Sequence, residues 1–342
     1  MQSVPVVTPD ALAALCPALD GTRIVDPIVG VDLRGPGPDV AVPPGDRILA
    51  GIGPVHPDRE ALAEAIDLTL APVPAARPHE VGVDDPEPAL TGLADVVHAA
   101  PRAATVLAGL LRWSGALPVD AALDAESFAY STLLGGPEFT GWLDARGPRP
   151  EPRPVPDPVL VARDGCVLRI TLHRPERRNA YGRQLRDALA DALDVAVLDP
   201  SVAHVVIGGA GPAFCSGGDL DEFGTTPDPV TAHLVRTRAG AARRLHALAG
   251  RTTVRLHGAC VGAGIELAAF ADRVVADAGT TVRLPEVTMG VIPGAGGTVS
   301  LPRRIGRWRA LYLALCGAAI DARTAVAWGL VDNLVEPDTG FM

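Results

Sequence analysis

The chain has 342 residues, of which 48% are hydrophobic, and it contains 37 glycines and 33 prolines. This composition is typical of a folded protein with one large or two medium domains and many turns, and it excludes disorder throughout. The formal net charge of −10 argues against nucleic acid as a partner, because the chain lacks a basic face that could neutralise phosphates.

The cysteines and the N-terminus indicate the cellular setting. The cysteines are scattered, odd in number and free of any C-x-x-C pair, so we expect no metal site and a reduced, cytoplasmic protein. They are Cys16, Cys166, Cys215, Cys260 and Cys316. The N-terminus lacks the features of a signal peptide, and no apolar run approaches the ~20 residues that span a bilayer. We therefore expect a soluble protein with no membrane partner.

The first half of the chain is predicted to be mainly helical. Two short strand-like pieces come first, at residues 24–33 and 47–52. Helices are then expected over 57–70, over 93–113 with a break or restart at Pro101, and over 120–134.

The sharpest change in composition is the segment R-G-P-R-P-E-P-R-P-V-P-D-P at residues 146–158. Alternating prolines forbid a helix there and favour an extended connector. We therefore predict two domains, a mainly helical one over residues 1–150 and a second one over residues 151–342.

The second half alternates strand and helix. Residues 159–172 are predicted to form a hairpin around Asp164-Gly165, a helix is expected over 179–196, and a buried strand over 203–211. This alternation predicts an α/β domain.

Two glycine-rich loops of the second half are candidate ligand-binding segments. In residues 211–223, Gly217-Gly218 would let a ligand approach the backbone closely, although an ordinary tight turn would also explain them. Residues 262–264, Gly-Ala-Gly, precede an apolar helical run, and N–H groups at a helix N-terminus stabilise a negative oxygen. Close helix packing would also explain these small residues. One donor from each loop is the minimum for an oxyanion hole.

Glu266 and Glu286 lie in apolar, glycine-rich surroundings where an exposed carboxylate is not expected. Apolar neighbours would raise the pKa of Glu266. Both residues also have a simpler explanation as acids in a first helical turn. Only tertiary folding would bring them together. With the two loops, they indicate an enzyme that stabilises an enolate and moves protons.

Other catalytic motifs are missing from the sequence. No G-x-S-x-G segment supports a serine hydrolase. The G-A-G segments lack the preceding strand, third glycine and ribose-binding acid of a dinucleotide site.

Residues 159–335 resemble the crotonase, or enoyl-CoA hydratase/isomerase, superfamily. The segments that carry the resemblance are H-R-P-E-R-R-N-A (173–180), A-F-C-S-G-G-D-L (213–220), H-G-A-C-V-G-A-G-I-E-L-A (257–268), L-P-E-V-T-M-G-V-I-P-G-A-G-G-T (284–298) and A-V-A-W-G-L-V-D (325–332). The resemblance implies an α/β fold, with a crotonase-like spiral core of β-β-α turns beside the mainly helical N-terminal domain. It also implies assembly as a homotrimer or homohexamer.

The resemblance further implies an acyl-CoA thioester as substrate, with coenzyme A as part of it and no separate cofactor. The backbone N–H groups of Gly218 and Ala263 would hold the thioester oxygen. The residues that match the lining of the nucleotide end are Arg177, Arg178, Ala180 and Ser216. The two arginines would pair with phosphates.

Glu266 and Glu286 match both glutamates of the hydratases, whereas many isomerases resemble this pattern with only the second. The resemblance thus favours hydration of a 2-enoyl-CoA to a 3-hydroxyacyl-CoA, a reaction of fatty acid metabolism. Glu266 would deprotonate water for attack at C3, and Glu286 would exchange the proton at C2. The alternatives are an isomerase, a dehydratase or another enolate-forming acyl-CoA enzyme, and, from another class, a catalytically silent CoA-binding scaffold.

The resemblance leaves one module unplaced. The sequence ends at Met342, soon after the G-L-V-D segment, where the family continues with a helical module. Residues 98–143 look like that module in helix order and in the phrase P-V-D-A-A-L-D-A-E. We hypothesise that the first half supplies these helices from the other end of the chain, covering the acyl pocket and mediating subunit contacts. An unrelated helical appendage is the alternative.

Overall fold

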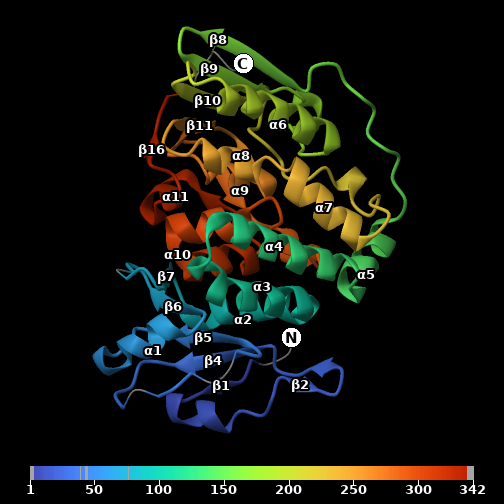
Figure 1. Ribbon diagram of the computed structural model, residues 1–342. Helices are drawn as coiled ribbons and strands as arrows, with labels where there is room; N and C mark the ends of the chain where they lie inside the picture. The colour runs from blue at the N-terminus through green and yellow to red at the C-terminus, as the bar shows by residue number, and fades with distance from the viewer. Residues whose placement is uncertain (1–3, 39, 43–44, 76, 337–342) are drawn as a thin grey trace.

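The computed structural model describes residues 4–38, 40–42, 45–75 and 77–336 (Figure 1). The first half of the chain contains a five-stranded parallel sheet in the order β1-β4-β5-β6-β7. The strands are β1 (Val6–Val7), β4 (Ile28–Asp32), β5 (Ile48–Ile52), β6 (Leu68–Pro72) and β7 (Glu80–Val83). All residues of β5 and all but the last of β4 are buried. Such continuous burial is typical of parallel strands that are covered on both faces.

The remaining elements of this region are short. They are η1 (Pro9–Ala14), the antiparallel pair β2 (Leu19–Asp20) and β3 (Arg23–Ile24), η2 (Pro57–Arg59) and α1 (Glu60–Ala65). The two predicted strand-like pieces correspond to β4 and β5 and are confirmed. The predicted helix over 57–70 is wrong in its second part, because α1 ends at Ala65 and residues 68–70 pair with β5 and β7. Tertiary pairing decides this segment, since a short apolar run fits a strand as well as a helix.

Four helices follow the sheet. They are α2 (Pro86–Ala99), α3 (Pro101–Trp113), α4 (Val119–Leu134) and α5 (Pro137–Arg146), with the short η3 (Ser114–Ala116) before α4. Pro101 is the first residue of α3, so the restart expected there is confirmed. The mainly helical character predicted for the whole first half therefore holds for residues 86–146 and not for residues 6–83.

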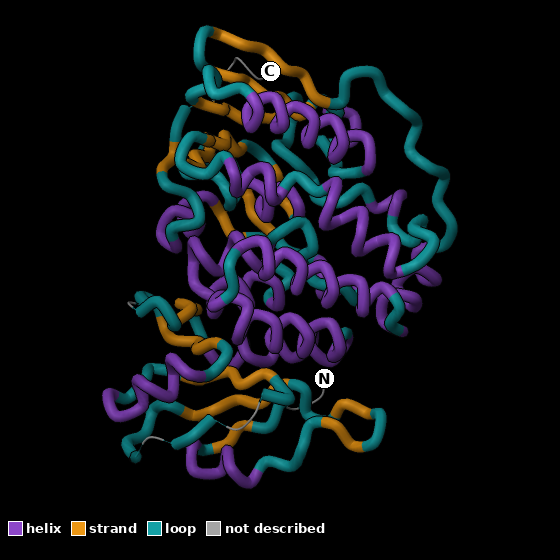
Figure 2. Tube along the Cα trace, in the orientation of Figure 1, coloured by secondary structure: helices purple, strands orange, loops and turns teal. Residues whose placement is uncertain are grey.

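Helices α2 and α3 lie between the first sheet and the second half of the chain (Figures 1 and 2). Helix α2 packs on β4, β5 and β6, and α3 packs on α10 (Gly297–Leu315), which breaks at Gly306. Buried side chains from both halves form one continuous cluster, which includes Leu70 and Leu107 from the first half and Leu301 from the second, and a smaller separate cluster lies in the first half around Val29, Val31 and Leu62. The two predicted domains thus share a hydrophobic core, and residues 147–158 between them contain no helix or strand.

The second half of the chain repeats a β-β-α unit. A six-stranded sheet has the order β16-β13-β11-β10-β9-β8, and a three-stranded sheet has the order β12-β14-β15. The strands are β8 (Val159–Asp164), β9 (Val167–Leu172), β10 (His204–Gly209), β11 (Thr252–Leu256), β12 (Ala259–Val261), β13 (Arg273–Ala276), β14 (Thr281–Arg283), β15 (Ile320–Asp321) and β16 (Asn333–Leu334). The helices are η4 (Pro175–Arg177), α6 (Arg183–Leu198), η5 (Leu220–Glu222), α7 (Pro229–Ala239), α8 (Ala242–Ala247), α9 (Ala263–Ala268), η6 (Glu286–Met289), α10 and α11 (Ala322–Trp328).

The register of the strands shows how the units stack. Strand β11 pairs in parallel with β13 in the large sheet, and β12 pairs in parallel with β14 in the small sheet. Each pair of strands then leads into a helix, α9 in one unit and η6 with α10 in the next. The predicted hairpin is the antiparallel pair β8 and β9, and the helix and strand predicted after it are α6 and β10. The expected β-β-α spiral is therefore confirmed.

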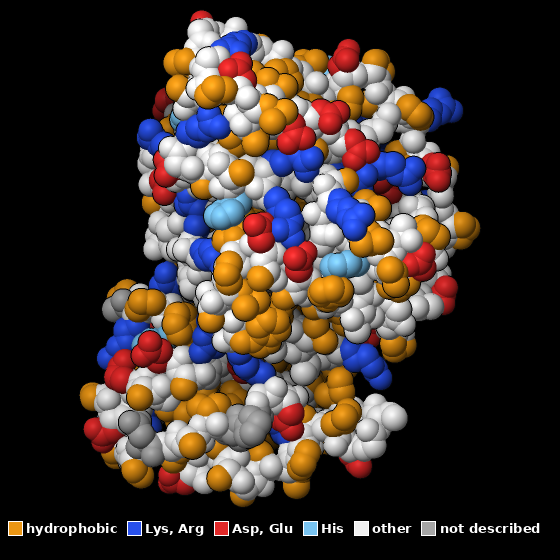
Figure 3. Space-filling model, viewed as in Figure 1, with side chains coloured by type: hydrophobic (Ala, Val, Ile, Leu, Met, Phe, Trp, Pro, Cys, Tyr) orange, Lys and Arg blue, Asp and Glu red, His pale blue; other side chains and the backbone are white. Residues whose placement is uncertain are grey.

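Charged side chains of both signs are interspersed on the face of the molecule that Figure 3 shows. Among the helices of the described residues, none has both the length and the apolar character needed to cross a bilayer.

Candidate active site

A cavity of about 750 Å³ lies between α9 and the helices α4, α5 and α7. Gly218, Ala263, Glu266 and Glu286 all line it, so the structure brings together the four residues that were predicted to be catalytic. The apolar side chains on its wall include Leu123, Leu134, Phe139, Leu143, Phe223 and Val235. The cavity therefore combines an apolar lining with a few polar groups, as small-molecule sites do.

The backbone N–H groups of Gly218 and Ala263, both on the cavity wall, have no acceptor among the described residues. Gly217, before the first, has a left-handed φ of +93°, and Gly262, before the second, has a φ of +48°. Glycine adopts this conformation without steric cost, which is why both turns need it. Two free donors on one cavity wall can hold an oxygen that becomes negative.

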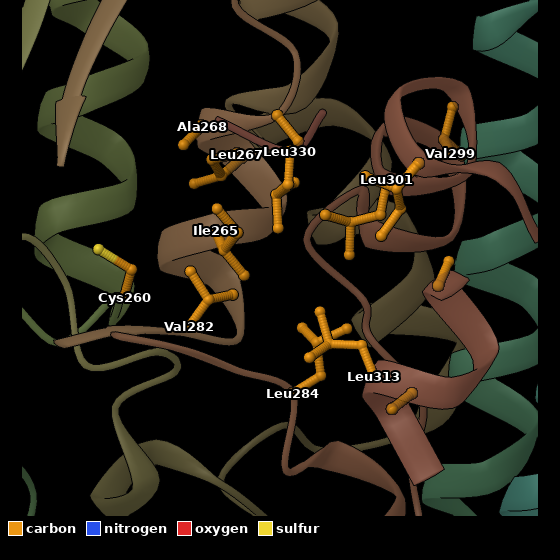
Figure 4. Packing of buried hydrophobic residues seen from close by; sticks show 14 of the residues in the cluster. Cys260, Ile265, Leu267, Ala268, Val282, Leu284, Val299, Leu301, Leu313 and Leu330 are labelled. Atoms are coloured by element: carbon orange, nitrogen blue, oxygen red, sulfur yellow. The ribbon is translucent and has the colours of Figure 1, made fainter. Parts of the chain in front are cut away.

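Helix α9 is anchored by its apolar residues. Ile265 lies close to Val282 of β14, and both are fully buried (Figure 4). Leu267 of the same helix is also part of the buried cluster. Because α9 is packed in this way, the Ala263 amide and the Glu266 side chain have fixed positions.

Glu266 is held at the N-terminus of α10. Its Oε2 accepts hydrogen bonds from the backbone N–H groups of Ala295 at 2.7 Å and Gly297 at 2.9 Å. A Cβ at Gly297 would lie 2.6 Å from Cγ of Glu266, so only glycine permits this approach. The helix N-terminus and the two amides orient the carboxylate and stabilise its charge.

A third buried carboxylate, that of Glu126, reaches the same loop from α4. Its Oε1 accepts from the Gly296 N–H at 2.7 Å, and its Oε2 accepts from the N–H of Thr298 at 2.8 Å and from its hydroxyl at 2.7 Å. Four consecutive amides, of residues 295–298, thus donate alternately to Glu266 and Glu126. Glu126 therefore ties a helix of the first half to the loop that positions Glu266.

The sequence analysis missed Glu126 as a functional residue. The signal was present, since Glu126 ends the phrase that carries the resemblance of residues 98–143 to the missing module. It also lies at helical spacing between Leu123 and Tyr130 on the apolar face of α4, where an acid needs a partner.

Glu286 is placed differently from the other two acids. It is the first residue of η6, and its buried Oε2 has no hydrogen-bond partner among the described residues. A Cβ at Gly262 would overlap its Oε1, so the positive-φ glycine before Ala263 also makes room for this carboxyl group. The carboxyl groups of Glu266 and Glu126 are thus held by amides, whereas that of Glu286 is free to exchange a proton.

Burial raises the pKa of all three carboxyl groups. It raises the pKa of Glu286 and that of Glu126 to about 7 each. Burial, followed by the charges of Glu286 and Glu126, also raises the pKa of Glu266, and the amides of Ala295 and Gly297 oppose that rise. The predicted rise for Glu266 is confirmed. The carboxyl groups of the cavity can therefore take up or release protons near neutral pH.

Of the residues expected at the nucleotide end of coenzyme A, Arg177, Arg178 and Ala180 share one segment and Ser216 lies on a neighbouring loop, and their environments differ. Arg177 donates to Asp219 at 2.6 Å and to Asp221 at 2.8 Å, so internal carboxylates already balance its charge. Arg178 is exposed, and its side chain has no partner in the described part of the chain. Ser216 donates its backbone N–H to the carbonyl of Arg178 at 2.9 Å. Ala180 is buried in the same turn. Arg178 is therefore better placed than Arg177 to meet a phosphate.

Two amides without an acceptor beside buried carboxyl groups of raised pKa are features of an enzyme site that could hold a carbonyl oxygen and exchange protons. The model of the enoyl-CoA hydratase/isomerase family matches residues 162–340, which is just over half of the chain. The chain therefore belongs to the enoyl-CoA hydratase/isomerase family.

Several relatives carry related names. The 2,3-dehydroadipyl-CoA hydratase of Escherichia coli K12 is 37% identical over 53% of this chain and 70% of its own length. The 1,2-epoxyphenylacetyl-CoA isomerase of the same strain is 34% identical over 51% and 68%. The mevalonyl-coenzyme A hydratase SIDH of Beauveria bassiana is 34% identical over 56% and 70%. A crystal structure of enoyl-CoA hydratase from Thermoplasma volcanium is 34% identical over 53% of this chain and 72% of that chain, with a TM-score of 0.49.

Proposed function

We propose that the protein adds water across the C2–C3 double bond of a 2-enoyl-CoA to form a 3-hydroxyacyl-CoA. The observation that carries this proposal is the convergence of Glu266, Glu286 and the free N–H groups of Gly218 and Ala263 on one cavity. The hydratases among the relatives support it.

The two amides bind the thioester oxygen. When a water oxygen bonds to C3, the electron pair of the double bond moves toward the carbonyl, and negative charge develops on the thioester oxygen. The N–H groups of Gly218 and Ala263 stabilise this enolate, and each such donor typically contributes a factor of roughly 10²–10³ to the rate.

The two carboxyl groups move the protons. Glu266, oriented by Ala295 and Gly297, takes in its ionised form the proton that the attacking water loses. Glu286, whose pKa of about 7 keeps a proton available near neutral pH, delivers that proton to C2. One proton is taken up and one is released, so the pair is restored by exchange between the two acids or with water.

An isotope experiment tests the proposal. A short-chain 2-enoyl-CoA is incubated with the protein in H₂¹⁸O, and the product is analysed by mass spectrometry while the enoyl absorbance is followed. Hydration predicts loss of the absorbance, one ¹⁸O in the product, and deuterium at C2 when D₂O is used. Binding of the thioester with no turnover at any chain length would contradict the proposal and favour the scaffold alternative.

An enolate-forming isomerase is the second candidate, because one relative is named as an epoxyphenylacetyl-CoA isomerase. In that reaction the same amides would hold the enolate, and a carboxyl would move a proton without adding water. A product with a moved double bond and no ¹⁸O would identify it.

We also propose that helices α3, α4 and α5 take the place of the family's C-terminal helical module. Residues of α4 and α5 line the cavity, and Glu126 contacts the loop that holds Glu266. Removing residues 1–150 would expose buried residues that now pack on α10, so the remaining chain should be insoluble or inactive. A soluble, active remainder would refute the replacement. The homotrimeric or homohexameric assembly, which sedimentation would test, and the cytoplasmic setting belong to the same proposal.

A further inference from the structure

Arg236 of α7 lies on the cavity wall in an unusual environment. Its guanidinium carbon lies 4.1 Å from the centre of the Tyr130 ring. Its Nη1 donates to the hydroxyls of Ser127 at 3.0 Å and Ser131 at 3.1 Å, both on α4. Its Nε and Nη2 donate to no residue of the described part of the chain. The Nε and Nη2 edge of the guanidinium group is therefore available to a ligand.

No carboxylate of the described residues forms an ion pair with Arg236. A second arginine on the same wall, Arg243, differs, since it contacts Asp120 and Asp124, the latter at 2.6 Å. Burial lowers the pKa of Arg236, which indicates that its charge is partly removed from water. A cation in this position needs an anionic partner to offset its desolvation.

The nearby glutamates do not fully provide that partner. The charges of Glu126 and Glu266 act on Arg236 without contacting it, and burial raises the pKa of both carboxyl groups, so less of their charge is present near neutral pH. Both oxygens of Glu126 are already bonded to residues 296 and 298. An anionic group bound in the cavity would therefore balance the remaining charge of Arg236.

The position of Arg236 indicates which part of a substrate it meets. Tyr130, on which it stacks, packs against Gly294, next to the amide that holds Glu266. Arg236 therefore lies beside the carboxyl groups, whereas Arg178 lies on the segment expected to meet the nucleotide end of coenzyme A. The apolar residues Leu123, Leu134 and Val235 lie on the same wall, where the hydrocarbon part of an acyl chain would pack.

We propose, as an extension of the hydratase function, that Arg236 binds an anionic group on the acyl chain, and that the protein prefers 2-enoyl-CoA substrates that carry a terminal carboxylate. The carboxylate would accept hydrogen bonds from Nε and Nη2, the pair of donors that matches its two oxygens. The stacked Tyr130 ring and the two serines hold the guanidinium in place for this contact.

The experiment compares two six-carbon 2-enoyl thioesters of coenzyme A, one ending in a methyl group and the other in a carboxylate. The wild-type kcat/KM for the carboxylate substrate should exceed that for the methyl substrate by roughly 10-fold or more, which is the range of one charge-assisted contact. In Arg236→Gln this ratio should fall to near one or below. Arg236→Lys, which keeps a point charge without the fork, should keep part of the preference.

Two variants separate this contact from a structural effect. Arg238→Gln removes an exposed arginine of the same helix, and Phe128→Ala removes the ring of α4 that stacks on His233 of α7 but leaves the contacts of Arg236 in place. Both should keep the wild-type ratio of the two substrates. If Phe128→Ala loses the ratio as fully as Arg236→Gln does, the preference depends on helix docking and the proposal is wrong.

The remaining outcomes are also decisive. Hydration of both substrates at equal kcat/KM by the wild type overturns the proposal but leaves the hydratase function intact, whereas turnover of neither overturns the hydratase function itself. If Arg236 binds a phosphate of coenzyme A instead, Arg236→Gln should raise KM by the same factor for both substrates. The wild type should then lose that factor in kcat/KM when the thioester of dephospho-coenzyme A is used. These two results together would make the assignment to the acyl chain wrong.

Discussion

The two walls of the cavity differ in what positions their functional groups. The wall formed by Gly218, Ala263, Glu266 and Glu286 has the groups proposed for the reaction, and it depends on backbone geometry because two of these groups are main-chain amides after positive-φ glycines. The opposite wall, formed by α4, α5 and α7, carries side chains whose positions depend on helix docking. The proposed reaction chemistry and the proposed recognition of the acyl chain can therefore vary separately in this protein, because different parts of the chain supply them.

The largest effects should come from the acids of the first wall. Glu266→Gln and Glu286→Gln should each lower kcat for hydration by roughly 10³-fold or more, because a positioned acid or base typically contributes 10²–10⁴. The loss of enoyl absorbance measures both rates. Glu176→Gln, at an exposed acid outside the cavity, is the control and should hydrate at the wild-type rate. Activity within 10-fold of wild type in either variant would remove that residue from the mechanism.

A glycine substitution tests whether the backbone of that wall sets the acid's position. Gly262→Ala should lower kcat by roughly 10²-fold, because the residue has a φ of +48° and its new Cβ would overlap the Glu286 carboxyl. Gly279→Ala, where a Cβ would meet nothing within 4 Å, is the matched control. Unchanged kinetics in Gly262→Ala would show that the reaction does not depend on a fixed position of the Glu286 carboxyl group.

Stability should depend on pH through the same carboxyl. The folded pKa of Glu286, about 7, lies above its ordinary value of 4.5, so the folded state binds the proton more tightly than the unfolded state. The stability that this provides is fully present below pH 4.5 and is lost as pH rises through about 7. The loss is about 1.4 kcal/mol per pH unit, or roughly 3 kcal/mol in all.

Glu286→Gln should therefore gain stability relative to wild type between pH 5 and pH 8. Urea unfolding at both pH values measures the two free energies of unfolding. An equal difference between variant and wild type at the two pH values would contradict the raised pKa.

The smallest effect should come from the contact that joins the two walls. Glu126→Gln keeps one acceptor oxygen but turns the other into a donor, which cannot bond the Thr298 or Gly296 amide. The loop that holds Glu266 should loosen, lowering kcat by roughly 10-fold with little change in KM, and shifting the acid limb of the pH–rate profile. Asp124→Asn, at a half-exposed acid of the same helix, is the control. A change confined to Tm, with no change in kcat or pH profile, would make Glu126 a structural residue only.

Part of the site could be predicted because local sequence determines it. The glycines at 217 and 262 mark turns that few other residues adopt, and the acids at 266 and 286 stand out among apolar neighbours. The hairpin of β8 and β9, the helix restart at Pro101 and the strands β4 and β5 followed from turn chemistry and apolar runs. These features depend on residues that are close together in the chain.

Other features required tertiary contacts. The strands β6 and β7 form only by pairing within the first sheet, and so the sequence pattern predicted a helix through residues 68–70. Glu126 meets the amides of residues 296 and 298 across about half of the chain, and the serines that bond Arg236 lie on another helix. The sequence by itself determined the family, the two glycine turns and the two acids of the cavity, since backbone sterics and local polarity act over short distances. Only the tertiary structure decided which helix covers the cavity and which charges it places there, because helix packing depends on side chains from segments that are distant in sequence.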